Sequence, residues 1–169
     1  MPSNLTHLKF GREFNRPLWP GVLPPNLTSI LFGARYNLPL WPGVLPQKLT
    51  HLKFATGSDF NHEIKLNVLP LSLTHIIYGH DFNQPLSVGV FSEGLQSLSF
   101  GTNFNQPLVV GVFPASLTHL SFGYKFNQLL NVDVLPRGLI NLEFDWNYEL
   151  SLSTNVLPPG LQSLNRKIF

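Results

Sequence analysis

The tripeptide Leu-Thr-His occurs four times in this sequence and contains four of its six histidines. These four are His7, His51, His75 and His119. Histidine changes its charge near neutral pH, so a recurring histidine can contact a ligand in a pH-sensitive way. Histidine, serine and asparagine are also ordinary residues on the solvent side of a strand, where duplication alone would copy them. The sequence leaves both interpretations open.

Established catalytic patterns are missing from the sequence. It contains no nucleophile elbow, phosphate-binding glycine loop, His-Glu-x-x-His motif or EF-hand loop. The nine carboxylates are scattered, and none recurs as a paired acid and base. We therefore expect a protein that is not an enzyme and has no cofactor. His51 and His75 could share a metal ion, but no third ligand is evident beside them, so we expect no metal site.

The amino-acid composition further limits the class of protein to which this chain can belong. Hydrophobic residues make up 43% of the 169 residues and charged residues 12%, with 15 prolines and 13 glycines, which favours a folded domain without long helices. A net charge of +2 is too small to indicate a nucleic-acid or membrane partner. Cysteine is absent, and the sequence shows neither a signal peptide nor an apolar run of about 20 residues. We expect an intracellular, cytoplasmic protein.

The elements that position the histidines come from an internal repeat. Leu-x-x-Leu or Leu-x-x-Ile pairs begin at Leu5, Leu27, Leu49, Leu73, Leu95, Leu117, Leu139 and Leu161. Every interval is 22 residues except the 24 between Leu49 and Leu73, where two extra residues lie within 55–59 and should form a loop. Such a short, constant period is typical of a solenoid, in which each repeat is one coil. We expect a single domain over residues 1–169 with about eight coils.

Each coil should contain one strand. Counting from the first leucine, position 4 is Leu or Ile and position 6 is aromatic in seven coils, on either side of a variable position 5. This alternation is typical of a strand, and strands so close in sequence can stack in one curved parallel sheet of about 34 Å. Positions 4 and 6 should face inward, and positions 3, 5 and 7 outward. The predicted binding residues on the outer face are His7, Lys9, His51, Lys53, His75, Ile77, Ser99, His119 and Ser121.

Further rows follow from the same alignment. An aromatic-Asn pair recurs after the strand, and its asparagines should bond loop backbone and form a ladder along the solenoid. Prolines in the return segments predict extended backbone with tight turns and almost no helix. A threonine row at position 2 could indicate an ice-binding face, but structural hydrogen bonding is the favoured interpretation. Trp19 and Trp41 should stack on each other, either as packing or as a small aromatic contact patch.

The pattern L-T-H-L-x-F-G-x-x-F-N-x-P-L-x-x-G-V-L-P resembles the FNIP repeat, an offshoot of the leucine-rich repeat class. The resemblance covers about residues 5–164, although the Asn falls two positions later than the usual one. It implies a right-handed, leucine-rich-repeat-like solenoid used for binding, in social amoebae and large DNA viruses of protists. A viral origin would place the protein in the host cytoplasm. Family members often carry an F-box ahead of the repeats, but no F-box-like segment precedes Leu5.

We therefore predict a non-catalytic repeat scaffold that binds an unidentified protein through the exposed face of the sheet. The alternatives are a self-assembly element or the substrate-recognition part of an F-box ubiquitin-ligase adaptor. Self-assembly is considered because the first coil is fully regular, so its strand near Thr6 to Phe10 should have an exposed edge. That edge could pair with another copy of the chain and form a homo-oligomer, or the chain could be part of a longer product.

Overall fold

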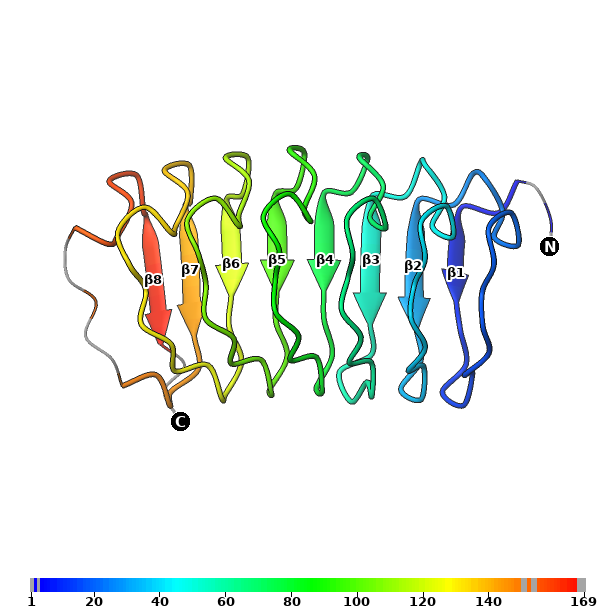
Figure 1. Ribbon diagram of the computed structural model, residues 1–169, viewed down its shortest axis with the longest axis horizontal. Helices are drawn as coiled ribbons and strands as arrows, with labels where there is room; N and C mark the ends of the chain where they lie inside the picture. Colours follow the sequence, from blue (N-terminus) through cyan, green and yellow to red (C-terminus); the bar gives the residue numbers. More distant parts are fainter. Residues whose placement is uncertain (1, 3, 150–151, 153–154, 167–169) are drawn as a thin grey trace.

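The repeats form one stacked solenoid in the computed structural model, which describes residues 2, 4–149, 152 and 155–166 (Figure 1). Each repeat contributes one strand, and all eight strands pair in parallel and in chain order. The strands are β1 (His7–Lys9), β2 (Ser29–Phe32), β3 (His51–Phe54), β4 (His75–Ile77), β5 (Ser97–Ser99), β6 (His119–Ser121), β7 (Asn141–Phe144) and β8 (Ser163–Arg166). The described residues contain no helix, and hence none that could cross a membrane. The predicted fold class is confirmed.

The hydrophobic core lies between the sheet and the return segments and consists of stacked side-chain rows. Position 4 fills the sheet side, with Ile30, Leu52 and Leu142 fully buried. The position-6 ring stacks on the ring of the aromatic-Asn pair in the same coil, as in Phe100 and Phe104, whose centroids are 3.8 Å apart. Rings of one row are 5.1–6.2 Å from those of the next coil, as in the 6.1 Å between Phe104 and Phe126. Two aromatic rows therefore run through the molecule.

Glycine follows the strand because consecutive coils approach each other there through their backbones. A Cβ atom at Gly101 would overlap the carbonyl oxygen of Gly79, and one at Gly33 would overlap that of Gly11. Gly33 and Gly79 are buried. The prediction that position 7 faces outward is therefore wrong for these glycines. The inward-outward alternation of side chains holds only within the three or four residues of each strand. Beyond the strand, the backbones of neighbouring coils meet at these glycines.

The two additional residues of the third repeat form the expected loop. A turn at residues 56–57 takes up the extra length, and the buried Ser58 closes the loop by accepting a hydrogen bond from the Phe60 amide at 3.2 Å. The sheet register is undisturbed beyond it, because His51 pairs with His75 and Leu52 with Ile76.

The return segments are extended and carry one tight turn per coil. The first has a hydrogen bond from the Val22 amide to the Trp19 carbonyl at 3.2 Å, and the next five coils repeat it. The third turn residue has a positive φ, for example 81° at Gly21 and Gly43, which glycine adopts without strain. Asn67 and Asp133 take the same conformation, as short polar side chains tolerate.

Candidate functional site

The register of the sheet gathers the nine predicted binding residues into two neighbouring columns on its outer side, which we call the sheet face. Position 3 contributes His7, Ser29, His51, His75, Ser97 and His119 from β1 to β6. Position 5 contributes Lys9, Leu31, Lys53, Ile77, Ser99 and Ser121. Each of the nine is at least partly exposed. Their placement on one exposed surface agrees with the sequence, whereas binding by them remains a prediction.

The threonine preceding each histidine is part of a hydrogen-bond relay. The hydroxyl of Thr50 donates to the Thr28 carbonyl at 3.0 Å, and Thr74 and Thr118 make the corresponding bonds to the coils before them. The threonine row thus has the structural role favoured from the sequence. The same hydroxyls lie 2.8–2.9 Å from Nδ1 of His51, His75 and His119.

This relay pairs each of these histidines with one hydroxyl, and the direction of that bond depends on the tautomer of the ring. A hydroxyl has one hydrogen, and the threonines donate theirs to a carbonyl oxygen. The contact with Nδ1 is satisfied only when the imidazole donates Nδ1–H to the hydroxyl oxygen. In the arrangement in which the hydroxyl donates to the carbonyl, the neutral rings of His51, His75 and His119 hold their proton on Nδ1 and leave Nε2 as an unprotonated acceptor.

Two of these rings are in direct contact. His51 on β3 and His75 on β4 stack with their centroids 4.4 Å apart and their planes 7° from parallel. Partial burial lowers the pKa of His75 below 6.5, and the nearby charges of His51, Lys53 and His119 lower it further. Within the described part of the chain, no three His, Asp or Glu side chains are grouped so that they could hold a metal ion.

Charge and shape change along the sheet face. From β1 to β6 the described face positions include two lysines and four histidines and no carboxylate, and Glu143 on β7 is the first acidic residue. Near β7 the small residues Ser97, Ser99 and Ser121 leave a hollow of about 190 Å³, which His119 and Glu143 also line. The face therefore has a basic half over β1 to β4 and a smaller, polar hollow beyond it.

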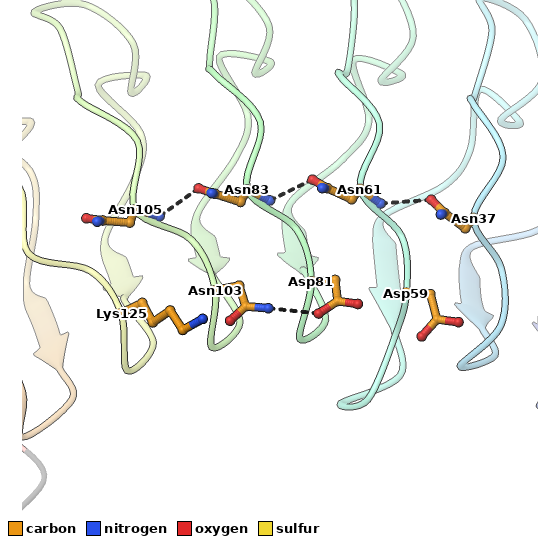
Figure 2. Close-up of a pocket in the computed structure, with 8 residues that line it drawn as sticks. All are labelled: Asn37, Asp59, Asn61, Asp81, Asn83, Asn103, Asn105 and Lys125. Carbon is orange, nitrogen blue, oxygen red and sulfur yellow. Dashed lines mark hydrogen bonds between the residues drawn. The ribbon is translucent and has the colours of Figure 1, made fainter.

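A second surface, which we call the amide groove, runs along the return side of the coils (Figure 2). The predicted asparagine ladder forms one wall, because each asparagine Oδ1 accepts the backbone N–H of the next asparagine. The distance is 3.1 Å from Asn61 to Asn37 and 2.9 Å from Asn105 to Asn83. The glutamine that follows the asparagine donates a second hydrogen bond to the same acceptor, as from Gln106 Nε2 to Asn83 Oδ1 at 2.9 Å. The ladder prediction is confirmed.

The other wall of the amide groove consists of residues that precede the aromatic-Asn pair. Arg35 binds Asp59 at 3.2 Å, and Asn103 Nδ2 donates to Asp81 Oδ1 at 2.8 Å, while Lys125 lines the far end (Figure 2). The groove has a volume of about 640 Å³. Sequence reasoning missed this wall because no single residue type recurs along it, and only the 22-residue register could have placed Asp59, Asp81, Asn103 and Lys125 in one column.

A third surface consists of exposed apolar residues on the return turns, and we call it the turn ridge. Trp19 is 59% exposed and Trp41 45%, without a ring contact between them, so the predicted stacking is wrong. Instead, Lys65 Nζ lies 5.9 Å from the centre of the Trp41 ring. Neighbouring coils extend the ridge with Leu66, Val88, Val110 and Val132, each about half exposed. The exposure of both rings argues against packing between them, and the alternative of an aromatic contact patch stays a prediction.

The stacked parallel strands, the leucine rows and the absence of helix among the described residues define a solenoid of the leucine-rich-repeat type. The chain belongs to the FNIP repeat family, whose model matches residues 1–35, 14–56, 36–81, 82–125 and 126–165. Its sequence is also 44% identical to that of CroV588, a circular leucine-rich-repeat protein of a giant virus. The structure of this chain superposes on the crystal structure of CroV588 with a TM-score of 0.94. That match covers 98% of this chain but only 24% of CroV588. No curated protein matches the chain. The fold thus indicates a scaffold or interaction role.

Proposed function

We propose that this chain is a non-catalytic scaffold that binds another protein through the sheet face over β1 to β6. The observation that supports this best is the pair of exposed columns at positions 3 and 5. The inward residues of the same strands are fixed by the core, whereas the outer residues vary from coil to coil. A rigid support that presents variable, exposed side chains is suited to recognition. The proposal includes no catalytic role, cofactor or metal.

The triple variant His51→Ala, Lys53→Ala, His75→Ala tests this proposal, with capture of proteins from host extract as the readout. The matched control removes the same residue types away from the sheet face, as His62→Ala, Lys65→Ala, His80→Ala. We expect the face variant to lose captured proteins that the wild type and the control retain. Unchanged capture by the face variant would refute this proposal and assign binding to another surface. Thermal unfolding of each variant verifies that it is folded.

Self-association through the edge of the solenoid is a second candidate, and the comparison with a circular protein supports it. CroV588 is circular, and this chain matches about a quarter of its length. At the β1 edge, Leu8 and Phe14 are only partly buried, whereas the corresponding Ile30 and Tyr36 of the next coil are fully buried. A further coil of the same repeat would cover them. Native mass spectrometry at several concentrations tests this, and a monomer at every concentration would refute it.

A further inference from the structure

We propose that the basic half of the sheet face, over β1 to β4, binds an acidic peptide segment of its partner and takes up protons on binding. This inference rests on the proposed function, since it names the partner chemistry and the regulation of the same surface. Three observations support it: the distribution of charge on the face, the contact of His51 and His75 with the preceding threonine hydroxyls, and the contact between the two imidazoles.

The charge of this half-face is complementary to an acidic segment. Lys9 and Lys53 extend from β1 and β3, and no described face position of these four strands holds a carboxylate. Of the carboxylates that follow these strands, all except Glu63 and Glu93 have a cationic or imidazole partner in the described residues. Glu13 lies 3.6 Å from Arg12, Asp59 lies 3.2 Å from Arg35, and Asp81 is bound by His80. A carboxylate supplied by a partner therefore meets cations on this face that no internal acid neutralises.

The threonine relay allows the histidines to gain a proton without rearrangement. When Nδ1–H of His51 and of His75 donates to the preceding threonine hydroxyl at 2.9 Å, an added proton binds Nε2. The Nδ1–H bond is kept in the imidazolium. Protonation therefore converts an acceptor on the free edge of the ring into a charged donor while the strand stays unchanged.

The stacking of His51 on His75 links the protonation of these histidines to the binding of an anion. Two imidazolium rings with centroids 4.4 Å apart repel each other, and Lys53 on the neighbouring position adds to the repulsion. His7 and Lys9 on β1 and His119 on β6 are the other titratable groups on the same face, and all are cationic when protonated. The free face therefore resists a second proton, and this repulsion adds to partial burial, which is the larger cause of the lowered pKa of His75. A carboxylate across β3 and β4 removes this resistance, so peptide binding and proton binding strengthen each other.

Fluorescence anisotropy with a labelled oligo-aspartate peptide tests the inference, at about pH 5.5 and about pH 7.5 in about 0.15 M salt. Since one unit of pKa change per histidine corresponds to a tenfold change in affinity, two histidines should make binding roughly tenfold or more tighter at the lower pH. The variant His51→Gln, His75→Gln should lose this pH dependence. The matched control His62→Gln, His80→Gln, which changes histidines outside the face, should keep it.

The possible results separate this inference from the proposed function. Absence of peptide binding at the lower pH, or pH dependence that survives His51→Gln, His75→Gln, overturns the inference. If the alanine variant of the face still loses its captured proteins, the proposed function stands. Tighter binding of an oligothymidylate of equal charge overturns the inference in favour of nucleic acid. Long-range proton–nitrogen NMR gives an independent check, since an Nε2–H tautomer of neutral His51 or His75 would contradict the relay.

Discussion

Replacement of Phe104 by alanine is the most direct test of the stacked core. Its ring is fully buried and lies 3.8 Å from Phe100 and 6.1 Å from both Phe82 and Phe126. Loss of a buried phenylalanine costs about 3–5 kcal/mol, and the stacked neighbours place Phe104 in the upper part of that range. We expect the variant to lose about 4 kcal/mol of unfolding free energy. A loss of this size is a large fraction of the stability of a domain.

The matched control is Phe14→Ala, in the same row of the first coil. Phe14 is only partly buried and has ring contacts with Phe10 at 4.2 Å and Tyr36 at 5.9 Å. Each repeat of a solenoid contacts only its neighbours, so damage at the end frays one coil whereas damage in the middle uncouples two halves. We expect about half the loss for Phe14, measured by urea unfolding followed by circular dichroism. Equal losses, or less than about 2 kcal/mol for Phe104, would refute this account of the core.

Three further substitutions test single polar groups. Tyr78→Phe should stabilise the protein by about 1 kcal/mol in urea unfolding, because the Tyr78 hydroxyl is buried without a hydrogen-bond partner and burial raises its pKa. Destabilisation would mean that the hydroxyl has a partner. Asn83→Ala should cost about 1–2 kcal/mol, since the Asn105 amide loses its acceptor, whereas Asn83→Asp keeps an acceptor oxygen and should recover most of that loss. Equal melting temperatures for the two variants would argue against the ladder. The pKa of His75 is lowered from 6.5, so the unfolded chain takes up its proton first, and stability should fall as the pH decreases through about 6.5. His75→Gln should remove this contribution in urea titrations across that pH range.

Most of the fold was predictable because every inward position is repeated. A single Leu-x-x-Leu-x-Phe segment is ambiguous, but the same pattern in register along the chain leaves one arrangement in which all the apolar rows are buried. The asparagine ladder was predictable for the same reason, since the backbone amide after each aromatic residue lies outside the sheet and needs an acceptor in each coil. The recurrence of one residue type at the same position of successive repeats thus predicted the structural rows.

The surfaces were predictable only in part. The sheet face follows from strand alternation, but this rule failed at the glycines, where a Cβ would meet the preceding coil. The amide groove gave no signal, because its second wall changes from aspartate at Asp59 and Asp81 to asparagine at Asn103 and lysine at Lys125. The two tryptophans were expected to stack because they share a position, yet their exposure shows that a shared position does not ensure contact.

The asparagine ladder and the threonine relay also have a direction. In both, the later coil donates and the earlier coil accepts, as in the bonds from Asn83 to Asn61 and from Thr50 to Thr28. A growing chain that is synthesised at about 5–20 residues per second adds one 22-residue coil every few seconds. Each new coil then meets acceptor oxygens that the previous coil already holds in place. The ladders thus allow the protein to fold in the order of its translation, with every finished coil as the template for the next.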